Sequence, residues 1–136
     1  MVNGEIQSKI QRIEENLKKL NKLSEMSWEE FADDFRNIEA AKHLLQTSIE
    51  AMIDIANYII AKNKLRKPDT SADAFAILAD NELIGPDCRD KYILMTKFRN
   101  RVVHLYTKVD EEEIYKIVQN NLSDYKRFIK DIIEIM

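Results

Sequence analysis

Apolar residues recur every three or four positions along most of the chain, the spacing that is typical of amphipathic helices. The first series predicts a helix that ends near Leu23. Its apolar positions are Ile6, Ile10, Ile13, Leu17 and Leu20. Ser27 and Glu30 then have the spacing of a capping box, in which each side chain bonds the backbone N–H of the other residue. A second helix is therefore expected to begin at this point.

The second helix continues from Phe35 and is apolar almost all round as far as Ile60, which indicates a central, buried helix. One narrow stripe of polar residues interrupts this apolar surface. It consists of Thr47, Glu50, Asp54 and Asn57, which are spaced by three, four and three. Such a stripe is either a solvated face of the helix or a row of side chains that serves a site.

The remaining pattern predicts a connection over residues 62–68, a short helix over 72–81 and a long helix that ends near His104. Gly85 is expected to end one element in the left-handed conformation, and Pro86 is expected to lie in the first turn of the next. Asp110 and Glu113 predict a second capping box at the start of a last helix that runs almost to Met136.

The chain has only two glycines and two prolines in 136 residues, which is too few turn residues for an all-β sandwich or barrel. We therefore expect an all-α fold, an up-down helical bundle of four long helices plus one short helix. Neither a repeat nor a linker divides the sequence, so a single domain is expected over residues 1–136.

Localisation follows from what the sequence lacks. Cys88 is the single cysteine, so we expect a reducing compartment and a structural role for this thiol. The N-terminal residues lack the pattern of a signal peptide, and no apolar run approaches about 18 residues. A soluble cytoplasmic protein without a membrane partner is therefore expected.

Several kinds of functional site have no signature in this chain. The two histidines are His43 and His104, and Glu39 is followed at the Glu-x-x-His spacing by Lys42, so the pattern of a di-iron bundle is missing. Glycine-rich phosphate loops and paired cysteines are absent as well. We therefore expect neither a metal site nor a cofactor.

Charge is distributed unevenly along the chain. Its net charge of −3 and isoelectric point near 5.5 argue against nucleic-acid binding over the whole surface. However, residues 91–109 contain no Asp or Glu and carry +5, so the rest of the chain carries −8. The basic residues of this segment are Lys91, Lys97, Arg99, Arg101 and Lys108. The pattern predicts one local basic site on an acidic protein.

The same segment gathers side chains suited to chemistry on a phosphate, namely Arg99, Asn100, Arg101, His104 and Tyr106. At about 100° per residue, Asn100 and His104 share one helix face, while Arg99 lies about 140° from His104. Either the helix unwinds before His104, or two copies of the chain complete one site. Each residue taken singly is also typical of an ordinary surface charge or, for Tyr106, of a core tyrosine with a solvated hydroxyl.

Residues 99–106, Arg-Asn-Arg-Val-Val-His-Leu-Tyr, match the signature of the HepT family, which is Arg, four residues, His, one residue and Tyr. HepT proteins are a branch of the HEPN superfamily of small helical ribonucleases. Residues 49–60 resemble the central helix of this family, and residues 76–84 resemble its segment before the motif. The resemblance covers nearly the whole chain.

This resemblance implies the toxin of a type II toxin–antitoxin system, a homodimeric endoribonuclease that needs no metal ion. Its catalytic residues would be Arg99 and His104, and its partners would be RNA and a nucleotidyltransferase antitoxin of the MNT class. The antitoxin would modify Tyr106 with adenylate. The alternative is a non-catalytic helical subunit that binds substrate or presents Tyr106 within a nucleotidyltransferase complex.

The chemistry of these residues agrees with RNA cleavage. When the 2′-hydroxyl attacks phosphorus, a base must accept its proton, an acid must protonate the leaving 5′-oxygen, and positive charge must stabilise the phosphorane. An imidazole is suited to either proton transfer, and the guanidinium of Arg99 is suited to supply the positive charge. Asn100 is expected to orient His104 or to hold a phosphate oxygen. Asp54 or Glu50 is expected to hold Arg99 or His104 in place, and a two-fold axis would bring a second His104 to the cleft.

Overall fold

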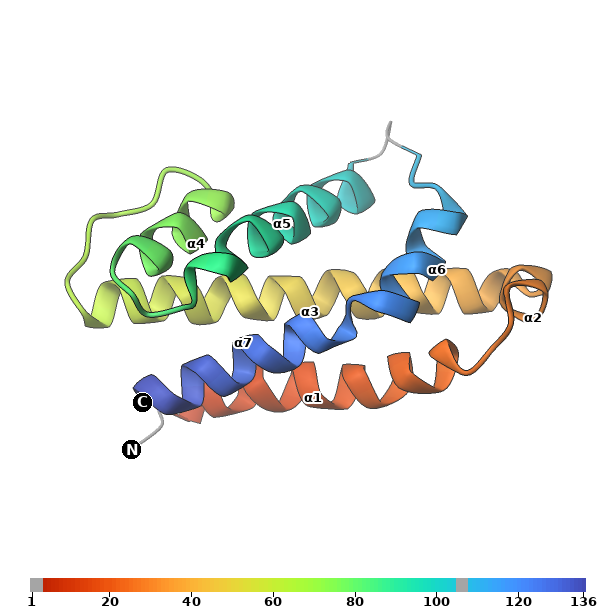
Figure 1. Ribbon diagram of the computed structural model, residues 1–136, viewed down its shortest axis with the longest axis horizontal. Coiled ribbons are helices and arrows are strands. Elements are labelled where there is room, and N and C mark those ends of the chain that lie inside the picture. The colour runs from red at the N-terminus through yellow and green to blue at the C-terminus, as the bar shows by residue number, and fades with distance from the viewer. Residues whose placement is uncertain (1–3, 105–107) are drawn as a thin grey trace.

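The computed structural model describes residues 4–104 and 108–136, which form helices joined by short connections and contain no strand (Figure 1). The helices in chain order are α1 (Gly4–Ser24), α2 (Trp28–Asp33), α3 (Phe35–Lys62), α4 (Ser71–Asp80), the 3₁₀ helix η1 (Pro86–Cys88), α5 (Arg89–Val103), α6 (Glu111–Asn120) and α7 (Leu122–Ile135). The expected all-α fold is confirmed.

The long helix α3 occupies the centre of the molecule (Figure 1). Helices α1 and α7 lie along one side of it, and α4 and α5 lie along the other. The nearly continuous apolar surface of α3 explains this position, because a helix flanked by neighbours on both sides must bury most of its circumference. Its polar stripe lies at the edge of these contacts, since Thr47 and Glu50 are partly buried and Asp54 and Asn57 are exposed.

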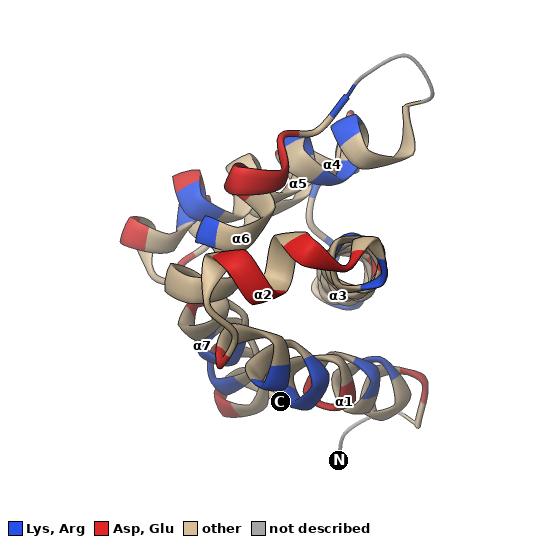
Figure 2. Cartoon of the chain, turned by 90° about the vertical axis from the view of Figure 1, so that its right-hand side faces the viewer, with Lys and Arg blue, Asp and Glu red and all other residues tan. Residues whose placement is uncertain are grey.

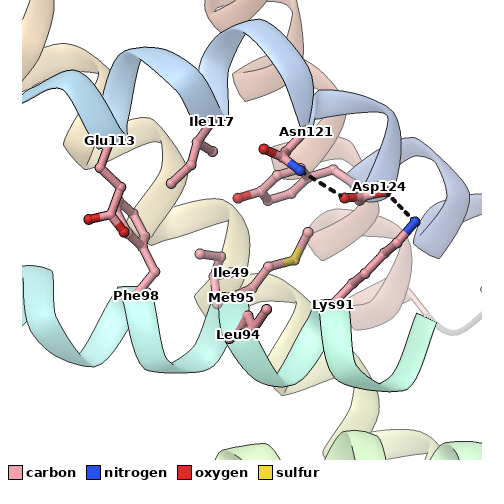
Figure 3. Close-up of a pocket in the computed structure, with 10 residues that line it drawn as sticks. Ile49, Lys91, Leu94, Met95, Phe98, Glu113, Ile117, Asn121 and Asp124 are labelled. Carbon is pink, nitrogen blue, oxygen red and sulfur yellow. Dashed lines mark hydrogen bonds and ion pairs between the residues drawn. The ribbon is translucent and has the colours of Figure 1, made fainter. Parts of the chain in front are cut away.

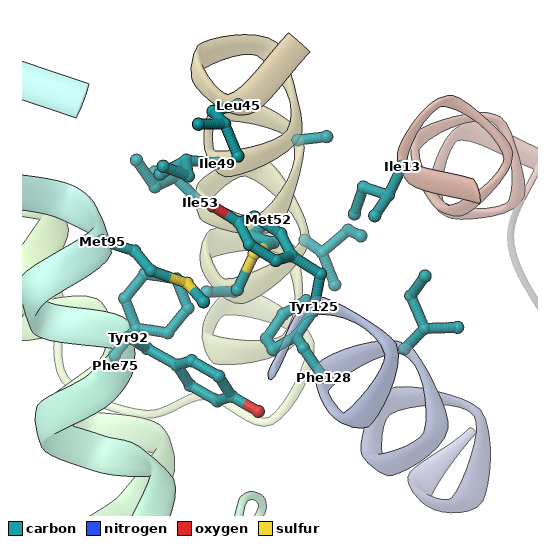
Figure 4. Close-up of a cluster of buried hydrophobic side chains, with 14 of the residues drawn as sticks. Ile13, Leu45, Ile49, Met52, Ile53, Phe75, Tyr92, Met95, Tyr125 and Phe128 are labelled. Atoms are coloured by element: carbon teal, nitrogen blue, oxygen red, sulfur yellow. The ribbon is translucent and has the colours of Figure 1, made fainter. Parts of the chain in front are cut away.

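Aromatic rings fill the core where α4, α5 and α7 meet (Figure 4). The ring centroids of Phe75, Tyr92 and Phe128 lie 5.4–5.9 Å apart in tilted or edge-on geometry, which suits the charge distribution of aromatic rings. Burial raises the pKa of the Tyr92 hydroxyl well above its ordinary value. Cys88 is buried beside this cluster, in keeping with the structural role expected for it.

Two of the expected long helices are each broken once. The capping box of Ser27 and Glu30 is confirmed, but the helix that it starts ends at Asp33, because the backbone of Asp34 is extended with φ −123° and ψ 111°. The Asp34 side chain then accepts the N–H of Arg36 and caps α3. A similar break at Asn121, with φ −118° and ψ 3°, separates α6 from α7.

The expectations for Gly85 and Glu113 need correction. The residue in the left-handed conformation after α4 is Glu82, with φ 58°, whereas Gly85 has φ −62°. The role of Gly85 is instead to leave room for nearby side chains. A Cβ at Gly85 would lie 2.6 Å from the guanidinium of Arg127. At the start of α6, Asp110 accepts the N–H of Glu112 at 3.0 Å, while the Glu113 carboxylate bonds Arg101 rather than completing a capping box.

None of the helices in the described part of the chain is both long enough and apolar enough to cross a membrane.

Candidate active site

The C-terminal end of α5 carries the sequence motif. The helix ends at Val103, and His104 is its C-cap residue with an extended backbone, φ −82° and ψ 119°. The His104 N–H still donates to the Asn100 carbonyl at 3.1 Å. Of the two alternatives left open by the sequence, the first concerns the helix, and the helix does end at Val103; the extended ψ of His104 then turns the following chain away from the helical path.

Arg99 is held by the polar stripe of α3. Its Nε and Nη2 donate to Oε2 of Glu50 at 3.1 and 2.9 Å, although 49 positions separate the two residues in sequence. The two side chains are 30% and 33% exposed, so the pair is partly buried and still open to solvent. A partly buried ion pair with two charge-assisted bonds fixes the plane of the guanidinium better than a surface pair does.

Asn100 provides the third contact of Arg99. Its Oδ1 accepts from Nη1 at 3.2 Å. A guanidinium has five N–H groups, so one on each terminal nitrogen stays without a partner among the described residues. These two donors remain available to phosphate oxygens. Glu50 and Asn100 thus orient Arg99 and leave its anion-binding edge available.

Asp54, which the sequence placed beside Glu50 as a candidate support, has a different partner. Its Oδ2 lies 2.9 Å from Nζ of Lys9 on α1. The physical reason is the position of the neighbouring helices: on the shared stripe, Glu50 faces α5 and Asp54 faces α1. The contact with Arg99 is therefore assigned to Glu50 rather than to Asp54.

A second ion pair fastens the end of α5 to α6. Arg101 donates from both terminal nitrogens to the two carboxylate oxygens of Glu113, at 2.9 and 2.5 Å. This contact raises the pKa of the Arg101 guanidinium, which also lies 5.7 Å above the ring of Phe98. The sequence pattern does not indicate this pair, because the spacing of Glu113 from Asp110 predicts a capping box instead. The pair anchors the backbone just before His104.

Tyr106, the third residue of the motif, lies outside the described residues. Residues on both sides are placed, since α5 ends at Val103 and Asp110 begins the cap of α6. In residues 4–104 and 108–136, no group of three or more His, Cys, Asp or Glu side chains is arranged to hold a metal ion.

A cavity of about 260 Å³ lies on another side of α5, between this helix and α6 and α7 (Figure 3). Its floor is apolar and includes Ile49, Met95 and Phe98, and its rim carries Lys91 and Asp124. Arg99 and His104 do not line it. The cavity therefore excludes Arg99 and His104, but it shares Glu113 with the Arg101 ion pair.

Comparison with known proteins places this arrangement in a family. The family model described as ribonuclease HepT-like matches residues 13–132. The mRNA nuclease HepT of Shewanella oneidensis is 36% identical over 105 residues, which are 77% of this chain and 78% of that protein. The tRNA nuclease HepT of Aphanizomenon flos-aquae is 26% identical over 127 residues, which are 93% of this chain and 86% of that protein.

The fold comparison agrees with the sequence comparison. A solved structure of the tri-AMPylated HEPN toxin of Shewanella oneidensis, in complex with MNT antitoxin, superposes with a TM-score of 0.90 and 32% identity. The match covers 99% of this chain and all of that one. Since the family model spans most of the chain and the fold as a whole superposes on that of a relative, the chain belongs to the HepT-like ribonuclease family.

Proposed function

We propose that this protein is the ribonuclease toxin of a toxin–antitoxin system and that it cleaves RNA with Arg99 and His104. The observation that carries the proposal is the oriented guanidinium of Arg99, whose two remaining N–H groups are available at the end of the helix that His104 caps. An anion clamp beside an imidazole is the arrangement that cleavage of a phosphodiester requires.

In the proposed mechanism, the 2′-hydroxyl of the substrate attacks the adjacent phosphorus and displaces the 5′-oxygen. Arg99 binds two phosphate oxygens and offsets the charge that builds on them in the transition state. His104 transfers a proton, either from the attacking hydroxyl or to the leaving oxygen. This reaction needs no metal ion, and Asn100 supports it by holding Arg99.

One chain supplies one His104, whereas the reaction needs both a base and an acid. A homodimer with the motif at its two-fold axis would supply the second imidazole, because symmetry places the same groups on both sides of the cleft. We therefore propose that the active form is a homodimer and that the cleft between protomers is the active site.

The proposed partner of the toxin is an MNT-type nucleotidyltransferase antitoxin, and the proposed site of its action is Tyr106. An adenylate on this hydroxyl would add bulk and negative charge two residues after His104, where the RNA phosphate has to bind, and so would block cleavage. The proposed location of both proteins is the cytoplasm.

Cleavage of RNA by the purified protein in EDTA tests the catalytic proposal. We expect Arg99→Ala and His104→Ala to lower the cleavage rate at least about 100-fold, which corresponds to the loss of a group that acts in the transition state. Lys97→Ala is the matched control, because Lys97 is an exposed cation on the same helix. Helical content by circular dichroism should be equal in all three variants.

Growth of cells that express the protein without an antitoxin separates the proposal from its alternative. A ribonuclease toxin arrests growth, and His104→Ala abolishes the arrest. If the wild-type protein is tolerated and cleaves no RNA, the chain is a binding subunit. If both active-site variants cleave RNA as the wild type does, the catalytic roles of Arg99 and His104 are wrong.

A further inference from the structure

A polar groove runs between α1 and α3. It has a volume of about 500 Å³. Its lining residues are Ser8, Gln11, Arg12, Glu15, Asn16, Lys19, His43, Leu44 and Thr47. Figure 2 shows α1 and α3 beside each other, with Lys and Arg along α1. The mechanism proposed above makes no use of this groove.

Three donors of the groove have no partner of their own. Arg12, Lys19 and His43 are exposed, and none of their side chains forms a hydrogen bond or ion pair with another residue in the described part of the chain. Neighbouring cations differ in this respect, since Lys9 pairs with Asp54 at 2.9 Å and Lys42 pairs with Glu39 at 3.1 Å. The acidic residue of the groove, Glu15, accepts a bond from Gln11. The groove therefore offers a surplus of positive donors.

The floor of the groove is polar and rigid. Asn16 is buried and its amide nitrogen donates to the hydroxyls of Thr47 and Ser48, at 2.9 and 3.0 Å, and to the Leu44 carbonyl at 3.3 Å. These bonds join α1 to α3 within the groove. The spacing between the cations is consequently set by two packed helices and not by loops.

The groove and the candidate active site share the polar stripe of α3. His43 precedes Glu50 by seven residues, so the two side chains lie on one face of the helix about 10 Å apart along its axis. Glu50 holds Arg99 on the α5 side of this face, and Thr47 meets Asn16 on the α1 side. A few nucleotides of an extended strand bridge such a distance.

We infer that the α1–α3 groove is a second binding site for the RNA substrate, in which Arg12, Lys19 and His43 bind backbone phosphates of nucleotides that flank the cleaved bond. The inference rests on the proposed function, because it assigns a further contact to the same RNA. Contacts to phosphates do not depend on the identity of the bases, so this site sets the affinity for long RNA and does not select the sequence that is cut.

Binding of oligonucleotides to the cleavage-deficient His104→Ala protein tests the inference. In this background, Arg12→Gln with Lys19→Gln should weaken binding of a strand of about 16 nucleotides roughly tenfold, and should leave a strand of about 4 nucleotides unaffected. The slope of log affinity against log salt should fall by about 1.4, since each phosphate contact contributes about 0.7 in single strands.

Two further variants separate phosphate binding from folding and from bulk charge. Lys126→Gln with Lys130→Gln removes the same charge from the exposed surface of α7 and should leave affinity and salt slope close to those of the parent. Arg12→Lys with Lys19→Arg keeps the charge and should restore binding of the long strand.

The possible failures point to different conclusions. If the groove variant binds the long strand as the α7 control does, the groove is not an RNA site, while the proposed function stands. If the His104→Ala protein binds neither strand, the proposed function fails and the inference fails with it.

Discussion

The contact between Glu50 and Arg99 makes a quantitative prediction about catalysis. Glu50→Gln keeps the size of the side chain but removes the charge that holds the guanidinium at two points. The pair is about one-third exposed, so its loss should lower the free energy of unfolding by only about 1 kcal/mol. The effect on cleavage should be larger, because misplacing a reacting group by about 1 Å can cost about 100-fold in rate.

Steady-state cleavage of an RNA substrate and urea unfolding measure the two effects separately. We expect Glu50→Gln to lower kcat about 10- to 100-fold and to leave KM unchanged or lower, since the freed Arg99 still attracts phosphate. Asp54→Asn is the matched control: it removes a carboxylate one turn along the same stripe, releases Lys9 instead, and should leave kcat at the wild-type value. An unchanged or increased kcat in Glu50→Gln, or an equal loss in both variants, would refute the positioning role of Glu50.

Three further predictions concern stability. Asn16→Ala removes a buried amide that joins α1 to α3, and urea unfolding should show a loss of about 1–3 kcal/mol. Gly85→Ala should cost less than about 1 kcal/mol in the same assay, because the new Cβ displaces the side-chain ends of Arg127 and Asp87, which form an exposed ion pair; a larger loss would indicate that the backbone has to move. The Arg66 guanidinium lowers the pKa of Asp73 from its ordinary 3.8 to about 2, so the stability that this pair contributes is present above pH 4 and lost as the pH falls towards 2. The difference in thermal midpoint between wild type and Asp73→Asn should therefore shrink over that range, and a constant difference would contradict the assignment.

Local features of the structure could be predicted from the sequence because their causes are local. The amphipathic period of α1 and the capping box at Ser27 involve residues within a few positions of one another, and both are confirmed. The end of α5 is a further case, since the helix was expected to end near His104 and ends at Val103. Whether two copies of the chain complete one site is not a local question, and the local pattern left it open.

The breaks at Asp34 and Asn121 show where local information was insufficient. Both residues occur within sequences of good helical periodicity, and both are tolerated inside helices as well as at caps. Packing against other segments favours the break at Asp34, because the short helix α2 places Phe31 in the core, where its ring lies 5.2 Å from that of Tyr115 on α6. This contact joins residues more than eighty positions apart.

The sequence by itself determined the helical class, the basic segment and the motif that identifies the family, because each depends on composition or on short spacing. Only the tertiary structure decided which carboxylate of the α3 stripe serves Arg99. Glu50 and Asp54 occupy adjacent turns of one face, and their partners differ because α5 packs on one side of that face and α1 on the other. Which carboxylate contacts Arg99 depends on how helices distant in sequence pack together, and the hydrophobic period of one helix does not specify that packing.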